Sequence, residues 1–476
     1  MNTAARRPTL AAHWRRVSVR LLPFADVASA DLPISKLLRL SLFQVSVGMA
    51  TVLLVGTLNR VMIVELGVHA WLVAAMASLP LLFAPFRTLI GYKSDTHQSA
   101  LGWRRVPYIW MGTLTQFGGL AIMPFALLVL SGDSHGPAWV GTTGAALAFL
   151  LVGAGMQVTQ TTGLALATDL ATPASRPRVV ALMYVMLLLG MVVSGMVFGL
   201  LLADFSQLRL IQVVQGAALV TMALNIAALW KQEGRGAPRP MPVADFRTSW
   251  RMFARHRHAV RFLIVVGLGT TAFNMQDIIL EPYGGEILNL SVGSTTTLTA
   301  LLSAGALCAF ALSARLLRRG ANAHRLAAVG LLMGVAAFAT VIFAAPLESP
   351  ALFRIGTLLI GFGGGLFAVS TLITAMNMEI GGHIGLALGA WGAVQACAAG
   401  VAIAAGGALR DGIGLLATHG WLGSALATPA TGYSFVYHAE IALLFITLVV
   451  LGPLVARAPD RQAPRPATFG LADFPG

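Results

Sequence analysis

Charged residues are scarce in this chain. Only 11% of its 476 residues are Asp, Glu, Lys or Arg, whereas 57% are hydrophobic. Soluble domains carry about 25% charged and about 45–50% apolar residues, so most of these side chains cannot face water. Cysteine is nearly absent as well, and Cys308 and Cys397 both fall in apolar stretches. This distribution argues against a disulfide framework and against a thiolate metal site.

Sequence patterns for covalent chemistry are also missing. The chain has no Walker, zinc-binding or catalytic-triad pattern. The glycine cluster GFGGG at 361–365 lies inside an apolar run, follows no strand and opens no βαβ unit. It therefore indicates close helix packing rather than a nucleotide loop. We expect a protein that is not an enzyme and holds no metal site of its own.

What the chain has in abundance is apolar stretches of the length that crosses a bilayer, about 20 residues each. They recur along nearly the whole sequence and predict twelve membrane-spanning helices. We place these helices at 38–62, 70–91, 106–130, 138–162, 179–203, 208–230, 259–281, 292–314, 324–345, 351–375, 384–408 and 433–456.

The basic residues divide unevenly between the two ends of these spans. One set of connections, with both termini, holds 28 Lys and Arg, and the opposite set holds four: Arg60, Arg209, Arg354 and Arg410. Cytoplasmic loops of membrane proteins carry the excess of Lys and Arg, so both termini are expected in the cytoplasm. The topology accounts for the net charge of +14, and no nucleic-acid role is needed.

A hydrophilic stretch at 231–258 divides the spans into six and six. This layout is typical of transporters built from two repeats around a central cavity. We predict an all-α polytopic membrane protein with twelve transmembrane helices in two pseudo-symmetric halves, the major facilitator fold. The predicted segments are a cytoplasmic basic N-terminal segment 1–36, the N-terminal half 37–230, a cytoplasmic linker 231–258, the C-terminal half 259–457 and a cytoplasmic tail 458–476.

The connection after the second predicted span carries a loose form of the facilitator-superfamily signature. It consists of Gly91, Asp95, Gly102 and the pair Arg104–Arg105, with a longer spacing between acid and arginines than usual. An acid in this motif lies against a neighbouring helix N-terminus, and the cations hold the cytoplasmic helix ends together. We expect the same role here.

Longer strings carry a more specific resemblance. LNRVMIVELG (58–67), YKSDTHQSALGWRRVPYIWMGT (92–113) and QDIILEPYGG (276–285) resemble the PucC/LhaA family of bacteriochlorophyll-delivery proteins. The resemblance covers about 37–451, and the segment 21–50 is most similar to the LhaA branch.

This resemblance implies a protein of the inner, intracytoplasmic membrane of photosynthetic bacteria. It implies an assembly factor for light-harvesting complexes, above all the core antenna, that binds and delivers bacteriochlorophyll. The implied partners are antenna polypeptides, with the reaction centre, a pigment synthase or the protein-insertion machinery as further ones. Two other functions stay open: a secondary transporter of a small amphipathic solute, and a ligand-free scaffold for antenna polypeptides.

The two halves carry opposite charges at equivalent places. Asn59–Arg60 ends the first span and aligns with Gln276–Asp277 at the end of the seventh. These two helices meet across the cavity in this architecture, so we predict an ion pair between Arg60 and Asp277 that acts as a clasp. Glu281 is a further gate candidate, although carboxylates just past an apolar run are commonly hydrated. The alternative is that each group is hydrated at the interface.

A pigment inside the bundle needs an axial ligand for its magnesium. None of the ten histidines lies at mid-span, and His438 lies at the edge of one. Amide oxygens also suit a hard cation. The candidate ligands are therefore His438 and the in-span amides Gln44, Gln116, Gln157, Gln160 and Gln395. Their ordinary role would be hydrogen bonding between helices. We find essentially no carboxylate in the inner halves of the spans, which weighs against ion-coupled transport.

Overall fold

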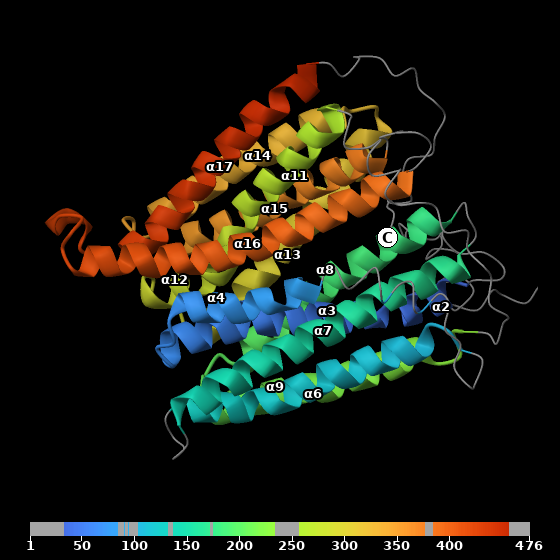
Figure 1. Ribbon diagram of the computed structural model, residues 1–476, viewed down its shortest axis with the longest axis horizontal. Coiled ribbons are helices and arrows are strands. Elements are labelled where there is room, and N and C mark those ends of the chain that lie inside the picture. The colour runs from blue at the N-terminus through green and yellow to red at the C-terminus, as the bar shows by residue number, and fades with distance from the viewer. Residues whose placement is uncertain are drawn as a thin grey trace, which may run out of the picture.

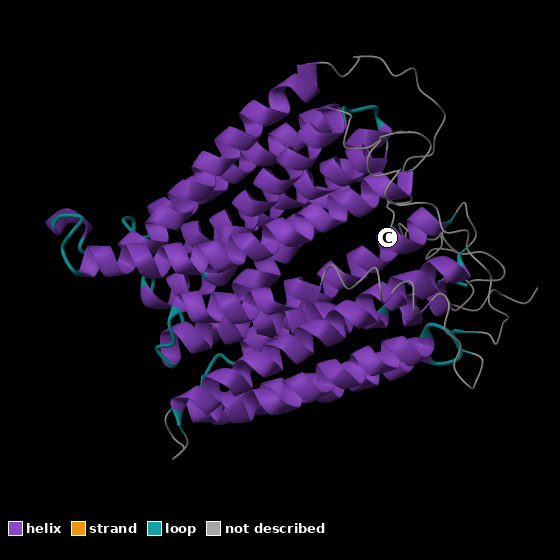
Figure 2. Cartoon of the chain, in the orientation of Figure 1, coloured by secondary structure: helices purple, strands orange, loops and turns teal. Residues whose placement is uncertain are grey.

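The fold was examined in a computed structural model that describes residues 33–83, 90, 94, 103–131, 137–171, 175–233, 257–376 and 384–456. These residues form helices and connections without a strand (Figure 2). In this part of the chain eleven helices are long and apolar enough to cross a membrane, and Ala70–Leu81 forms a shorter apolar helix. The predicted all-α membrane fold is confirmed.

The first half begins with a span assembled from several helical segments. It consists of α2 (Ile34–Leu40), α3 (Leu42–Thr51) and two π-helical segments, η2 (Val52–Leu58) and η3 (Val61–Glu65). The remaining helices of this half are α4 (Ala70–Ser78) with the 3₁₀ segment η4 (Leu79–Phe83), α6 (Val106–Leu130), α7 (Ala138–Leu170), α8 (Arg176–Leu201) and α9 (Gln207–Leu229).

The second half opens with a span that is interrupted. It consists of α11 (Arg257–Asn274), the 3₁₀ segment η5 (Met275–Ile278) and α12 (Leu280–Glu286). The other helices are α13 (Val292–Arg318), α14 (Ala323–Ala344), α15 (Pro350–Met376), α16 (Ile384–Thr418), the short η6 (Ser424–Leu426) and α17 (Ala430–Ala456). Figure 1 shows the helices of the two halves gathered in two groups.

Successive spans run in opposite directions through the bundle. We call the end where α9 ends and α11 begins the linker end, and the end where α12 ends and α4 begins the distal end. Two predicted spans are too short, because α7 continues to Leu170 and α16 continues to Thr418. The seventh span, predicted as one helix over 259–281, is interrupted after Asn274.

Small residues let the two halves approach each other closely. A β carbon added to Gly199 of α8 would lie 2.9 Å from the carbonyl oxygen of Gly293 in α13. One added to Gly407 of α16 would lie 2.7 Å from the carbonyl oxygen of Ala70 in α4. Without hydrophobic driving force between helices in lipid, such close packing is what holds helices together. The two contacts join the halves in their distal parts.

Candidate functional site

The break in the seventh span is the first feature of the site. Pro282 has no N–H, so it cannot donate to the carbonyl of Ile278 four residues earlier. The amide Nδ2 of Asn59, from the first span, lies 3.4 Å from that carbonyl oxygen and 3.2 Å from that of Asp277. A side chain of one half thus satisfies backbone groups exposed by the break in the other half.

Arg60 makes different contacts from those predicted. Its guanidinium pairs with Glu65, and its Nη2 donates to the carbonyl oxygen of Leu290 at 3.1 Å. The predicted ion pair between Arg60 and Asp277 is therefore wrong for this structure. The cause is the π-helical segment η3, because residues five apart lie on one face of a π-helix. Glu65 is thereby brought to Arg60.

A carboxylate that the sequence reasoning missed lies beside the break. Glu440 of α17 is fully buried, and its Oε1 accepts a hydrogen bond from the backbone N–H of Gln276 at 2.6 Å. The expectation of no carboxylate in the inner part of a span is wrong here. The signal was in the sequence, because Glu440 stands well inside the predicted span 433–456.

Two further carboxylates accompany Glu440. Glu281 is only 3% exposed, and its Oε1 accepts from the Thr299 hydroxyl at 2.7 Å. The carboxylate of Asp277 accepts from the side-chain amide of Gln276. Among the described residues, none of the three carboxylates has an ion-pair partner. Buried carboxylates in a span that have no countercharge commonly mark functional positions.

A second polar network lies at the distal end. Arg410 of α16 pairs with Glu286 at 2.7 Å and with Asp411 at 2.6 Å, and the Tyr433 hydroxyl donates to Glu286 at 2.8 Å. Asp411 also accepts the backbone N–H of Trp71 at 2.7 Å. A carboxylate of the second half therefore caps the N-terminus of α4 in the first half. This contact joins the halves through α4 and α16, whereas the predicted Arg60–Asp277 clasp would have joined the first and seventh spans.

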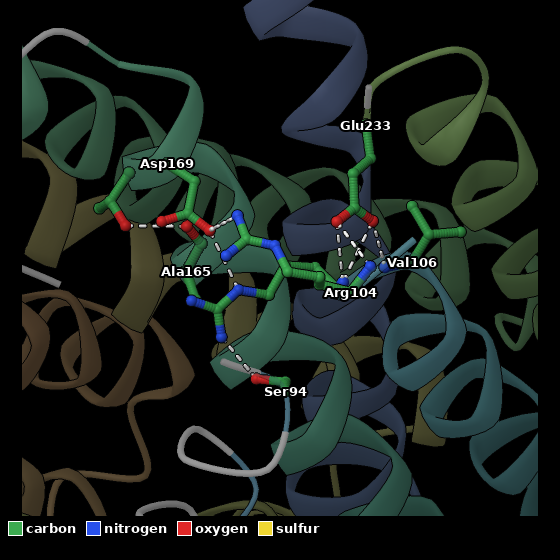
Figure 3. Close-up of polar contacts among 8 residues, drawn as sticks. Ser94, Arg104, Val106, Ala165, Asp169 and Glu233 are labelled. Atoms are coloured by element: carbon green, nitrogen blue, oxygen red, sulfur yellow. Dashed lines mark hydrogen bonds and ion pairs between the residues drawn. The ribbon is translucent and has the colours of Figure 1, made fainter. Parts of the chain in front are cut away.

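The linker end holds the third polar cluster (Figure 3). Nε of Arg105 donates to Asp169 of α7 at 3.1 Å. The carboxylate of Glu233 accepts the backbone N–H groups of Arg104 at 2.8 Å and Val106 at 2.9 Å. The N-terminus of α6 is thus neutralised by an acid from the segment that follows α9.

The signature residues of this connection are only partly within the described chain. Gly91, Asp95 and Gly102 lie outside the described residues, so their predicted roles stay predictions. Arg104 and Arg105 reach Asp169, at 3.9 Å and 3.1 Å. This arrangement of cations against an acid at helix ends matches the physical role predicted for the pair.

Four of the predicted pigment ligands lie in the first half. Nε2 of Gln160 lies 3.5 Å from Oε1 of Gln44, and Nε2 of Gln116 lies 3.3 Å from the carbonyl oxygen of Ser46. Oε1 of Gln116 and Oε1 of Gln157 are buried without a hydrogen-bond partner among the described residues. These amides therefore serve interhelical bonding in part and keep unused acceptor atoms.

The two other candidates lie on the second half. Gln395 is half-buried on α16, and His438 is exposed on α17. Nδ1 of His438 lies 2.7 Å from the carbonyl oxygen of Ser434. A carbonyl oxygen can only accept, so Nδ1 donates in this contact and Nε2 takes no part in it. The exposed imidazole can therefore act as a ligand.

An apolar pocket opens at the distal end of the first half, between the end of the first span, α6 and α9. Its cavity volume is about 120 Å³. Its wall is largely apolar and includes Val61, Leu127, Phe205 and Leu210, with Glu65 as a polar lining residue. An apolar chain is the kind of group that such a wall accepts.

The fold places this protein in a known structural class. It resembles the solved structure of a bacterial homolog of the human lysosomal transporter Spinster in an inward-facing, unoccupied conformation. The TM-score is 0.65, the sequence identity is 15%, and the match covers 90% of this chain and 98% of that one. Among the described residues, eleven helices long enough to span a membrane and one shorter apolar helix, together with this likeness, define a membrane protein of the major facilitator fold.

The family follows from the sequence itself. Residues 57–458 match the family described as PUCC protein, and the chain belongs to this family. It is 56% identical to a protein of Rhodobacter capsulatus described as an uncharacterized protein in the puhA-bchM intergenic region, over 95% of this chain and 97% of that one. It is also 56% identical to Protein PucC of Rhodovulum sulfidophilum, over 83% of this chain and 89% of the relative.

Proposed function

We propose that this protein is an assembly factor for light-harvesting complexes, in particular the core antenna, that binds bacteriochlorophyll in the membrane and delivers it to antenna polypeptides. The observation that carries the proposal is membership of the PUCC family over residues 57–458. Both termini are assigned to the cytoplasmic side of the inner membrane. The reaction centre, a pigment synthase or the insertion machinery are the further partners.

The donor atoms in the chain fit such a cargo. The magnesium of a bacteriochlorophyll is a hard cation that takes an axial oxygen or imidazole ligand. Oε1 of Gln116 and Oε1 of Gln157 are buried acceptors without a partner in the described chain. His438 is exposed on α17, and its contact with the carbonyl oxygen of Ser434 uses Nδ1 rather than Nε2. We assign the amides to pigment inside the first half and His438 to pigment on the outer face.

The surroundings of these donors also suit the cargo. A porphyrin-derived ring with an apolar tail needs an apolar environment and few polar groups. The first half offers buried amides and, at its distal end, a small and largely apolar pocket of about 120 Å³. Gln116 and Gln157 project from α6 and α7. A charged solute would require a countercharge. Around Gln116 and Gln157, the described interior of this half carries amide and hydroxyl groups instead.

The test is a deletion strain complemented with matched variants. Deletion is expected to lower the near-infrared absorption of assembled core antenna while pigment synthesis continues. Gln116→Leu and Gln157→Leu together should reduce both antenna absorption and the pigment that copurifies with the protein. Gln215→Leu, at an exposed position of α9, is the control and should leave both unchanged.

The alternatives predict other results. Normal antenna absorption in the deletion strain, with no second family member present, contradicts the assembly role. A protein that purifies without pigment but restores the antenna is a ligand-free scaffold. The buried carboxylates Glu281 and Glu440 favour a secondary transporter as the second candidate. That function predicts solute uptake into proteoliposomes by a colourless protein.

A further inference from the structure

We propose that Glu440, together with Gln276 and Tyr437, forms a proton-binding site at the break of the seventh span. The ligand is a single exchangeable proton, bound on the Glu440 carboxyl group. This inference does not depend on the cargo, because it rests only on the groups around the break.

The position of Glu440 makes an isolated negative charge costly. The residue is fully buried in α17, and no cation among the described residues pairs with it. Moving a carboxylate away from water without a countercharge costs several kcal/mol, and proteins offset this by pairing it or by neutralising it. Pairing is not available to Glu440, so neutralisation by a proton is the remaining route.

Two acceptor oxygens and one hydroxyl group around Glu440 are buried without a partner in the described chain, so the site is short of one hydrogen-bond donor. Oε1 of Glu440 accepts the N–H of Gln276 at 2.6 Å, but Oε2 has no partner in the described chain. Oε1 of Gln276 and the hydroxyl of Tyr437 are likewise buried without a partner. An ionised carboxylate has only acceptors to offer. A proton on Oε2 turns one acceptor into an O–H donor and removes an unsatisfied group.

The residues that share this site come from two spans. Tyr437 and Glu440 are three residues apart on α17 and therefore lie on one face of that helix. Gln276 belongs to η5, where the break exposes its N–H. The ring of Tyr437 packs against Tyr283 with 5.4 Å between centroids. Aromatic rings thus close the site on one side and keep water away from it.

The charged groups nearby do not replace the proton. From the first span, Arg60 is paired with Glu65. From α16, Arg410 is held by Glu286 and Asp411. The charged or titratable residues of the packed helices α11 and α14 are confined to their first five residues, at the linker end: Arg257, His258, Arg261, His324 and Arg325.

Acidic and phenolic groups from the neighbouring helices also favour a proton on Glu440. Asp277 and Glu281 lie in the same interrupted span, and Tyr283 and Tyr433 complete the surrounding set. Each further carboxylate adds like charge to the region, and like charges at short distance disfavour ionisation of all of them. One proton on Glu440 reduces this repulsion.

A proton bound here would act on the contact between the halves. Glu440 accepts a hydrogen bond from the backbone N–H of Gln276. In the same break, the side-chain amide of Asn59, from the first half, donates to the carbonyl oxygens of Asp277 and Ile278. Arrival or departure of the proton changes the hydrogen bonds at one end of this short segment. The site is therefore placed to make the joint between the first and seventh spans sensitive to protons.

The test is infrared spectroscopy of the purified protein in detergent or lipid discs. A protonated carboxyl group gives a carbonyl stretch that an ionised carboxylate lacks, and the stretch shifts when the proton is exchanged for deuterium. We expect such a band in the wild type, and we expect Glu440→Gln to remove the component of it that Glu440 contributes. Glu348→Gln, at an exposed distal position, is the matched control and should keep the band.

An unchanged spectrum in a folded Glu440→Gln protein would overturn the proposal, because Glu440 would then be an ionised carboxylate solvated by water. Folding is checked by circular dichroism and gel filtration. If Glu440→Gln does not fold, Glu440→Asp and Tyr437→Phe provide the test. Each should shift the frequency of the band, by changing the carboxyl group or its hydroxyl neighbour. An unshifted band in both variants rejects the site.

Discussion

Single charged residues at the distal end are held by partners from neighbouring helices. Arg410 of α16 lies between Glu286 of α12 and Asp411, and its guanidinium carbon lies 4.6 Å from the centre of the Tyr433 ring. The guanidinium is 20% exposed and the Glu286 carboxylate 24%. At this degree of burial an ion pair and a cation–π contact both gain strength over their values in open water.

The Arg410–Glu286 pair should therefore be energetically coupled. In a double-mutant cycle with Arg410→Ala and Glu286→Ala, we expect a coupling energy of about 1–3 kcal/mol. Arg410→Ala leaves the partly buried Glu286 carboxylate without its cation, and Glu286→Ala leaves Arg410 with Asp411 alone. Unfolding in detergent measures it. The same cycle at Arg209 and Asp204, whose side chains are 48% and 91% exposed, is the control and should give about 0.5 kcal/mol or less. Additive effects at Arg410 and Glu286 would contradict the assignment.

Residue contacts were only partly predictable from the sequence. The alignment of Asn59 with Gln276 correctly indicated which span ends meet, because a repeat places equivalent residues opposite each other. The partner of Arg60 was not predictable, since a helical period of 3.6 residues hides the π-helical register that presents Glu65 to it. Glu440 was overlooked because one carboxylate barely changes the hydropathy of an apolar stretch.

At the scale of helices, glycine sets how closely the spans pack. A β carbon on Gly361 of α15 would overlap the carbonyl oxygen of Leu302 in α13. On the other side of α15, a β carbon on Gly363 would lie 2.8 Å from the carbonyl oxygen of Gly330 in α14. The prediction that the GFGGG cluster serves close packing is confirmed. This packing role could be predicted from the sequence, because the glycines occur inside an apolar run that forms a helix rather than a loop.

Adding one methyl group at this contact should loosen the bundle. Gly361→Ala is expected to lower the free energy of unfolding by about 1–3 kcal/mol, because backbone rather than a movable side chain blocks the new atom. Gly216→Ala in α9 is the matched control, since a β carbon there meets nothing within 4 Å. It should be neutral or stabilise the helix by up to about 1 kcal/mol. Equal thermal midpoints for the two variants in detergent would refute the packing role of Gly361.

The interrupted seventh span could not be predicted from helical periodicity. Asn274, Gln276 and Asp277 mark the break in the sequence together with Pro282, but polar residues also occur inside unbroken spans, as Gln116 does in α6. Proline in the first turn of a helix is compatible with the helix that follows, so its presence alone does not locate a break. Tertiary contacts stabilise the break. Glu440 accepts a hydrogen bond from the N–H of Gln276, and the side-chain amide of Asn59 donates to two carbonyl oxygens.

At the scale of the whole molecule, the distribution of basic residues matches the arrangement of the helices. The four arginines that fall outside the basic set of connections, Arg60, Arg209, Arg354 and Arg410, all lie near the distal ends of their spans. The number of spans and their alternating direction were predictable, because each span must be long and apolar on its own. The contacts of α8 with α13 and of α4 with α16 were not predictable, because small residues occur on many faces of these helices.

The orientation in the membrane follows from the same distribution and can be measured directly. Ser349→Cys and Ser424→Cys place thiols at the distal end, and Ser35→Cys places one at the linker end. The background carries Cys308→Ala and Cys397→Ala, since both native thiols are exposed. The excess of Lys and Arg at the linker end predicts that this end faces the cytoplasm. A membrane-impermeant maleimide added to spheroplasts should therefore label the two distal thiols.

The Ser35→Cys thiol should react only after the membrane is opened. Equal total labelling of all three variants in detergent serves as the control for reactivity. Labelling of Ser35→Cys alone in intact spheroplasts would invert the orientation while preserving the fold. Labelling of Ser349→Cys and Ser424→Cys from opposite sides would contradict the twelve-span arrangement itself, because α15, α16 and α17 place both positions at the distal end.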